Sequence, residues 1–448
     1  MTSLFRLATP TAARRLAPTV FALLFLCILV LPARAMEVQT VTSAKGVTAY
    51  LVSDSTLPIV TLDFSLPAGS ITDPVGKRGL AYLASGLIDE GAGEYDSQAF
   101  REHLQDLAIE LHFDAGRDTF NGTLKTTTDN LDEAFRLLRL ALTEPRFDAE
   151  PVERIRAQVL SSIRRDDEDP NTIAFRAWMK EVMGDHPYTE DEKGTVDSVA
   201  AITADDLRMF MKTRLSRKDL SIGVAGDVDA GTLSALLDET FGSLPEKANL
   251  PQVPKPVITL TGKTTVIDRD IPQSMAVLGQ KGLLREDPRW HVAYVLNYIL
   301  GGGGFSSRLT EEVREKRGLA YSAYSYLYPF RLTGLWIAGT ATQNARMGES
   351  LKVIRDQWRR MAEEGPTAEE LKDAKTYLTG AWPLRFTSTE AVAGMLAAMR
   401  VNDLPPDYID SRNAKVEAVT IEDIRKLAKE LMDPDALTAV VVGKPEGV

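Results

Sequence analysis

The stretch "VAAITADDL", residues 199–207, recurs in altered form as "VEAVTIEDI", residues 416–424. Each copy has a threonine followed three residues later by an aspartate, a variant of the capping box that opens a helix. The pairs are Thr203 with Asp206 and Thr420 with Asp423. An amphipathic segment follows each copy, and then an apolar strand-like segment, "LSIGVAG" or "LTAVVVG". The two copies and the two apolar segments are separated by the same offset of 217 residues, which indicates an internal duplication.

The duplication predicts two homologous domains of about 200 residues each. Between them, residues 245–256 read "PEKANLPQVPKP", and the frequent proline predicts a linker. The predicted division is a signal segment at 1–35, an N-terminal domain at 36–244, a linker at 245–256 and a C-terminal domain at 257–448.

Each predicted domain mixes strands with helices. Residues 59–66 alternate between apolar and polar side chains, which predicts a half-buried antiparallel strand. Val60, Leu62, Phe64 and Leu66 would line one face, and Thr61, Asp63 and Ser65 the other. Residues 130–142, "NLDEAFRLLRLAL", are typical of an amphipathic helix. Strands grouped with strands predict the α+β class, each domain being a mainly antiparallel sheet with helices packed on one face.

The first 35 residues have the features of a signal peptide. Arg6, Arg14 and Arg15 precede the apolar run "VFALLFLCILVL" at 20–31, and "ARA" ends at Ala35. The alternative is a membrane anchor, but a span needs roughly 20 apolar residues and this run is shorter. The sequence therefore predicts an exported protein with no stable membrane span.

The single cysteine, Cys27, lies in this segment, so the mature chain would have no disulfide, thiolate nucleophile or cysteine-bound zinc. An exported chain without cysteine indicates a periplasmic location. The formal net charge of −11 argues against nucleic acid as a partner.

Four stretches resemble the pitrilysin/insulinase family of metallopeptidases, which includes the mitochondrial processing peptidase. They are "LPAGSITDPVGKRGLAYLASGLIDEGAG" at 66–93, "LTEPRF" at 142–147, "DHPY" at 185–188 and "GGGGFSSRLTEEVREKRGLAYS" at 301–322. The resemblance covers nearly all of the mature chain. It implies two homologous domains that form half of a clam-shell chamber for unfolded peptides.

Active members of that family bind zinc through H-x-x-E-H on a helix and a glutamate on a later helix. At the matching positions this chain has Tyr82, Ser85 and Gly86, and the later glutamate falls at Ser161 or Ser162, of which Ser162 is preferred. The resemblance thus implies a degenerate zinc site, with no metal and no cofactor in this chain.

No other catalytic centre is apparent in the sequence. The four histidines, His103, His112, His186 and His291, do not share a ligand spacing, and each is expected to be packed or solvated. The chain also lacks the G-x-S-x-G motif of serine hydrolases. An independent peptidase with an unusual metal site therefore has little support.

The C-terminal half contains the arginine and tyrosine, seven residues apart, that active family members use at the zinc site. Here "VREKRGLAY" puts Arg314 and Tyr321 at those positions. A phenol hydroxyl can stabilise the charge that develops on a carbonyl oxygen, and an arginine can hold the substrate backbone. Spacing alone is also compatible with a surface arginine and a packed tyrosine.

The glycines Gly301, Gly302, Gly303 and Gly304 could cradle a phosphate, but no lysine-serine follows in P-loop spacing. A helix C-terminal turn that leads into a flexible loop fits better. In the family such a loop lines the substrate chamber.

The hexapeptide "KRGLAY" occurs at residues 77–82 and 316–321. These copies lie 239 residues apart, not 217, so they are not equivalent positions of the duplication. The first would open the helix that carries Tyr82, and the second would lead Tyr321 into a strand.

The resemblance implies a zinc-less subunit of a heterodimeric periplasmic peptidase. Its partner would be a homologous H-x-x-E-H subunit that holds zinc, and Arg314 and Tyr321 would complete the partner's site. The alternative is a non-catalytic structural or peptide-binding protein with the same fold.

Overall fold

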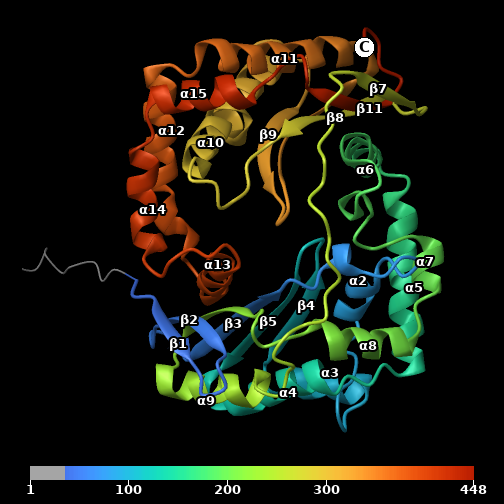
Figure 1. Cartoon of the computed structure of the whole chain (residues 1–448), viewed down its shortest axis with the longest axis vertical. Helices are drawn as coiled ribbons and strands as arrows, with labels where there is room; N and C mark the ends of the chain where they lie inside the picture. The colour runs from blue at the N-terminus through green and yellow to red at the C-terminus, as the bar shows by residue number, and fades with distance from the viewer. Residues whose placement is uncertain (1–35) are drawn as a thin grey trace, which may run out of the picture. The chain divides into compact units, whose positions relative to one another are not determined.

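The computed structural model describes residues 36–448 (Figure 1). The predicted signal segment, residues 1–35, lies outside the described residues. A six-stranded sheet forms from the N-terminal half of the chain, with strand order β1-β2-β6-β3-β5-β4. Its strands are β1 (Gln39–Thr42), β2 (Thr48–Ser53), β3 (Ile59–Leu66), β4 (Glu110–Ala115), β5 (Phe120–Thr127) and β6 (Ser221–Gly226).

A five-stranded sheet forms from the C-terminal half, with strand order β7-β11-β8-β10-β9. Its strands are β7 (Thr264–Asp268), β8 (Gln273–Lys281), β9 (Ser322–Pro329), β10 (Gly334–Gln343) and β11 (Thr438–Gly443). Each sheet contains one parallel pair, β2 with β6 and β7 with β11, and its other pairs are antiparallel. Apart from β1, the two sheets have the same topology, which confirms the predicted duplicated α+β fold.

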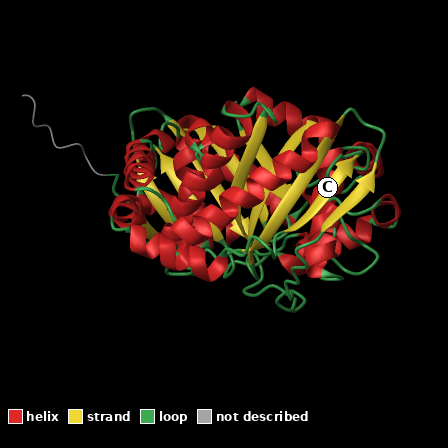
Figure 2. Ribbon diagram, turned by 90° about the horizontal axis from the view of Figure 1, so that it is seen from above, coloured by secondary structure: helices red, strands yellow, loops and turns green. Residues whose placement is uncertain are grey.

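Helices lie against the strands of both sheets (Figure 2). In the N-terminal half they are α2 (Leu80–Ser85), α3 (Ser97–Asp106), α4 (Leu131–Thr143), α5 (Ala149–Asp166), α6 (Pro170–Met183), α7 (Val196–Ala200), α8 (Ala204–Arg214) and α9 (Ala230–Phe241). In the C-terminal half they are α10 (Trp290–Asn297), α11 (Met347–Glu364), α12 (Ala368–Gly380), α13 (Thr389–Val401), α14 (Tyr408–Glu417) and α15 (Ile421–Leu431). The predicted amphipathic helix at 130–142 is α4, and its apolar face packs in the first core.

The repeated stretch that revealed the duplication opens equivalent helices. Both predicted capping boxes form, at the start of α8 and at the start of α15. The strands that follow, β6 and β11, end at Gly226 and Gly443 with φ of 129° and 137°. A Cβ on Gly226 would lie 2.0 Å from the carbonyl oxygen of Ile59, and one on Gly443 would lie 2.4 Å from Ser274 Oγ. Both strand ends therefore require glycine.

Strand β3 departs from the half-buried strand that the alternation predicts. Its apolar residues point into the first core as expected, and Leu62 is fully buried. The opposite face is largely covered as well, since Thr61 is also fully buried and its hydroxyl lies 2.8 Å from that of Thr389 in α13. A helix from the other half of the chain therefore covers the face that the sequence pattern leaves to solvent.

The two halves exchange helices. Helix α13 packs on β2, β3 and β6 of the first sheet, and α6 packs on β8 and β11 of the second sheet (Figure 1). Trp178 in α6 is fully buried and donates a hydrogen bond of 2.9 Å to the carbonyl of Thr438. On the second sheet, Val277 and Ile337 pack with α6, whereas Leu278 and Trp336 belong to the core formed with the helices of the C-terminal half. Each sheet thus has its own helices on one face and an exchanged helix on the other.

No helix or strand lies between the end of α9 and the start of β7, a segment that contains the predicted linker at 245–256. Among the described residues, none of the helices has the length and apolar character that a membrane crossing requires.

The close approach of α13 to the first sheet predicts that Gly223 cannot be replaced. A Cβ at this position would lie 2.2 Å from the carbonyl oxygen of Ala393 and 2.6 Å from Leu396 Cβ. We expect Gly223→Ala to lower the free energy of unfolding by about 1–3 kcal/mol in urea denaturation, because the helix must move away from the sheet. Gly380→Ala is the control, since its Cβ meets nothing within 4 Å. Equal stability of the two variants would contradict this packing.

Candidate functional site

Arg314 and Tyr321 lie next to each other in the structure. Arg314 belongs to a π-helical turn, Thr310–Glu315, and Tyr321 directly precedes β9. The chain reverses between them at Gly318, which has φ of 59° and donates a hydrogen bond of 2.8 Å to the carbonyl of Arg314. As a result, the Arg314 guanidinium carbon lies 4.6 Å from the centre of the Tyr321 ring.

A third residue, which the sequence analysis did not single out, completes this group. The Phe305 ring centre also lies 4.6 Å from the Arg314 guanidinium carbon. A cation over aromatic faces is attracted by the ring electrons, so both rings hold Arg314 in a defined orientation. In the sequence, Phe305 was marked only by its position, as a large aromatic residue directly after four glycines.

Tyr321 is 81% exposed and Phe305 69% exposed. Within residues 36–448 the Tyr321 hydroxyl has no hydrogen-bond partner, and the nearest charge partner of Arg314 is Glu315 at 3.3 Å. Exposed aromatic rings with a free hydroxyl and a held cation can engage a ligand or another protein surface.

The four glycines join α10 to Phe305. Gly301 and Gly302 lie in a π-helical turn, Tyr298–Gly302, that extends α10. A Cβ on Gly301 would lie 2.5 Å from the amide nitrogen of Ser325, and Gly304 has φ of 57°. A Cβ on Gly303 would lie 2.7 Å from the carbonyl oxygen of Tyr298. Tight packing and a left-handed turn therefore explain why this segment is glycine.

The positions that match H-x-x-E-H and the later glutamate lie on two neighbouring helices. Tyr82 and Ser85 are in α2, Gly86 ends that helix, and Ser162 is in α5. Ser85 is buried and donates a hydrogen bond of 2.9 Å to the carbonyl of Tyr82. Ser161 is exposed, whereas Ser162 is half-buried and accepts a hydrogen bond from Lys193.

A lysine joins two of these positions. Lys193 Nζ donates hydrogen bonds to Ser162 Oγ at 2.9 Å and to Asp166 Oδ2 at 2.6 Å, and it lies 6.0 Å from the centre of the Tyr82 ring. Burial works against the charged form of Lys193, but the hydrogen bond and charge of Asp166 outweigh it and raise the pKa of Lys193. The positively charged ammonium group of Lys193 therefore lies beside two positions at which the resemblance would place zinc ligands.

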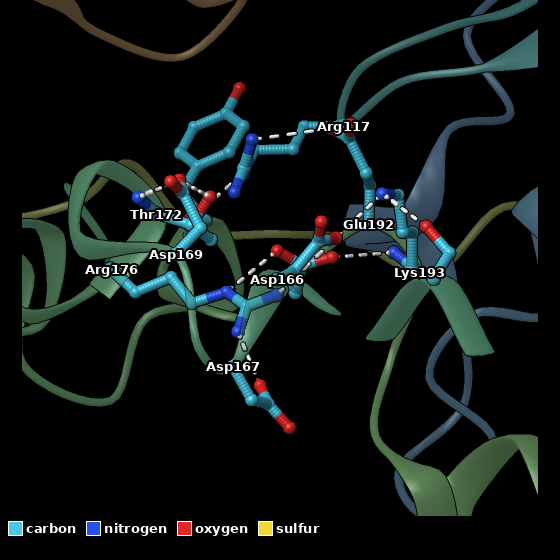
Figure 3. A network of polar contacts seen from close by, with 11 residues as sticks. Arg117, Asp166, Asp167, Asp169, Thr172, Arg176, Glu192 and Lys193 are labelled. Carbon is cyan, nitrogen blue, oxygen red and sulfur yellow. Dashed lines mark hydrogen bonds and ion pairs between the residues drawn. The ribbon is translucent and has the colours of Figure 1, made fainter. Parts of the chain in front are cut away.

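Lys193 belongs to a network of ion pairs in which basic and acidic side chains neutralise one another (Figure 3). Arg176 contacts Asp167 at 2.7 Å and Asp191 at 2.9 Å, and Arg117 contacts Glu192 at 3.2 Å. Because each cation already has a carboxylate partner, this network has the character of a structural tie. Among the described residues no group of three or more His, Cys, Asp and Glu side chains could hold a metal ion.

Helix α2 starts at a buried carboxylate. Asp73 accepts hydrogen bonds from the backbone amides of Gly79 at 3.0 Å and Ala81 at 3.2 Å. Burial raises the pKa of Asp73 to about 7, although these amides and the nearby Arg214 and Arg78 act in the opposite direction. The first "KRGLAY" copy thus builds a helix start, with Gly79 at φ of 90°, whereas the second forms the turn that orients Tyr321.

A duplicated α+β fold, with a lysine beside two of the positions that match the zinc site, defines a metallopeptidase-like class of protein. The chain belongs to peptidase family M16: residues 48–193 match the model described as insulinase (peptidase family M16), and residues 201–378 match the peptidase M16 inactive domain. The family resemblance seen in the sequence is confirmed.

Several relatives are similar over long stretches. An uncharacterized zinc protease of Streptomyces coelicolor is 32% identical over 65% of this chain and 64% of its own length. A Helicobacter pylori protein named non-peptidase homolog YmxG is 24% identical over 92% of this chain and 95% of its own. The crystal structure of a peptidase M16 inactive domain from Pseudomonas fluorescens has a TM-score of 0.85 and 28% identity, and the match covers 91% of this chain and 98% of that one. Together with the replaced ligand positions, the likeness to the non-peptidase homolog and to the M16 inactive domain supports a family member that is not catalytic on its own.

Lys193 should be a stability determinant. We expect Lys193→Met to lower the free energy of unfolding by about 1–3 kcal/mol, because the half-buried Asp166 loses its closest cation. Lys180→Met is the matched control: its pair with Asp185 is exposed, with side-chain exposures of 56% and 97%, and should contribute little. Urea denaturation of both variants measures the difference, and an equal loss in the two would argue against a structural role for the network.

Proposed function

We propose that this chain is the zinc-less subunit of a two-subunit peptidase of family M16. It would supply Arg314 and Tyr321 to the zinc site of a homologous partner that contains H-x-x-E-H. The observation that carries the proposal is the exposed Tyr321, whose ring is held against the Arg314 guanidinium by the turn at Gly318.

The chemistry of the pair suits peptide hydrolysis. A zinc ion in the partner would activate the attacking water. Negative charge then develops on the peptide carbonyl oxygen, and the Tyr321 hydroxyl can donate a hydrogen bond to it. Arg314 would orient the tyrosine through its ring contact and could hold a backbone carbonyl of the substrate with its remaining N–H groups.

The first half contributes no metal chemistry in this proposal. Tyr82 and Ser162 contact a lysine, and Ser85 bonds within its own helix. Peptides would bind between the two subunits as unfolded chains. The signal-like segment at 1–35 supports a periplasmic location.

A second candidate is a non-catalytic structural or peptide-binding protein. It is favoured by the Helicobacter pylori relative, which matches most of this chain and is named a non-peptidase homolog. In that case Arg314 and Tyr321 would form part of a protein–protein interface. Removing the Tyr321 hydroxyl would then leave the peptidase activity of a mixture with a family partner unchanged.

A mixing experiment separates the two candidates. The chain and an H-x-x-E-H family member, purified separately, are expected to cleave unfolded peptides only when combined. Tyr321→Phe should lower kcat about 100-fold or more, because one hydrogen-bond donor to the transition state is removed, while co-elution of the two chains persists. Tyr95→Phe is the control, since it makes the same change where the hydroxyl contacts Arg136 in α4. Unchanged turnover in Tyr321→Phe would exclude the tyrosine from the reaction.

The metal content provides a further check. Elemental analysis of the purified chain is expected to find far less than one zinc per chain, and all zinc in the active mixture should follow the partner. One tightly bound zinc per molecule of this chain would refute the zinc-less subunit.

A further inference from the structure

A group of cationic side chains surrounds one tyrosine in the C-terminal half. Tyr408, in α14, is 5% exposed, and Arg285 Nη2 donates a hydrogen bond of 2.9 Å to its hydroxyl. His291 Nε2 lies 3.2 Å from the same oxygen, and Lys415 Nζ lies 5.1 Å from the ring centre. Arg412, one turn along α14, completes the group, which we call the Tyr408 cluster: Arg285, His291, Tyr408, Arg412 and Lys415. Helices α10 and α14, which contribute most of it, lie side by side (Figure 1).

The cations of the Tyr408 cluster lack acidic partners. Within residues 36–448, no carboxylate lies within ion-pair distance of Arg285, Arg412 or Lys415, in contrast to the network around Lys193. Arg412 is 4% exposed and donates to the Leu378 carbonyl at 2.7 Å and to Asn413 Oδ1 at 2.9 Å, both of which are neutral acceptors. Burial, followed by the charges of Arg285, Lys415 and Arg412, lowers the pKa of His291 to about 4. The local field is therefore positive.

The cluster faces open space. Arg285, His291 and Lys415 line a cavity of about 840 Å³, and Arg285 also lines a second cavity of about 230 Å³ together with Arg412. The larger cavity also contains carboxylates: Asp287 is paired with Arg289, and Asp118 accepts a hydrogen bond from Tyr188. Glu286 and Asp403 line the cavity too, and both are exposed and form no ion pair within residues 36–448. The unpaired cations are concentrated at the Tyr408 end.

The orientation of Arg285 suits an anion. Its guanidinium carbon lies 5.0 Å from the Trp290 ring centre and 5.6 Å from the Tyr408 ring centre. Aromatic contacts hold the planar group but use none of its N–H donors, and within residues 36–448 Arg285 forms one hydrogen bond, to Tyr408. The remaining donors can bind a carboxylate through two parallel hydrogen bonds.

We propose that the Tyr408 cluster is a binding site for a carboxylate of a peptide, held by Arg285 and Lys415 at the wall of the larger cavity. The choice of a peptide as the source of the anion rests on the proposed function, whereas the anion site itself rests on the unpaired cations. An α-carboxylate at the peptide C-terminus and an acidic side chain share this chemistry.

The test uses three fluorescent peptides of one neutral sequence with a blocked amino end. One has a free C-terminal carboxylate, one a C-terminal amide, and one an amide and a single internal glutamate. Fluorescence anisotropy with the purified full chain is expected to give a Kd for the acid about 10-fold or more below that of the neutral amide. Recovery of the affinity in the glutamate peptide identifies side-chain carboxylates as ligands too, and its absence restricts the site to the C-terminus. Equal Kd values for all three peptides would overturn the proposal.

Variants assign the effect to the cluster. Arg285→Gln and Lys415→Gln should each reduce the ratio of the acid and amide Kd values toward one. Lys415 is exposed and forms no hydrogen bond in the described chain, so its replacement leaves the fold intact, whereas replacing Arg285 also removes a hydrogen bond to the buried Tyr408. Arg360→Gln, on the surface of α11 and paired with Glu364 at 2.9 Å, is the control and should preserve the ratio. If both cluster variants keep the original ratio of the acid and amide Kd values, the site is refuted. This result is independent of the mixing experiment, because the Kd values are measured without a partner subunit.

Discussion

Glycine at two sheet positions allows the rest of this fold to assemble. Gly223 in the first sheet and Gly279 in the second leave room for a helix to lie directly on the backbone of the strands. A Cβ on Gly279 would lie 2.5 Å from Trp178 Cζ2 in α6. Without these gaps neither exchanged helix could reach its sheet, and the fully buried Trp178, whose removal from a core typically costs about 3–5 kcal/mol, would have no place.

The same architecture separates two kinds of charged site. Around Lys193, opposite charges lie within hydrogen-bond distance of one another, so the field is cancelled locally and the helices are tied together. Around Arg314 and Tyr408, aromatic rings hold the cations, and rings fix a cation in space without neutralising it; Arg314 has one exposed carboxylate neighbour, Glu315. A cation held in this way remains available to a ligand, and both proposals for this chain depend on that difference.

Local features of the fold were predictable because they depend on residues close in sequence. The capping boxes at Thr203 and Thr420, and the identical offsets of the strands that follow them, report local hydrogen bonds and periodicity. The burial of Thr61 was not predictable, since it depends on a helix 328 residues away. A pattern of alternating residues describes the two faces of a strand but not what will cover each face.

The candidate site likewise contains residues that the sequence predicted and residues that only the tertiary fold reveals. The spacing of Arg314 and Tyr321 pointed to a pair, and the turn at Gly318 explains why the side chains meet. Phe305 could not be chosen from the sequence, because its contact with Arg314 depends on how the glycine segment leaves α10. Lys193 was equally hidden: it follows α5 by nearly thirty residues and returns to it only through the tertiary fold.

The exchange of α6 and α13 sets the order in which the chain can be completed during its synthesis. The first sheet has all its strands once residue 226 has been made, yet the face that carries Thr61 and Gly223 stays uncovered until α13 ends at residue 401. Helix α6 waits in turn for β11, which ends at residue 443. A nascent chain therefore leaves one sheet face and the buried surface of α6 uncovered over much of its translation, and neither half is a finished folding unit before the last strand emerges.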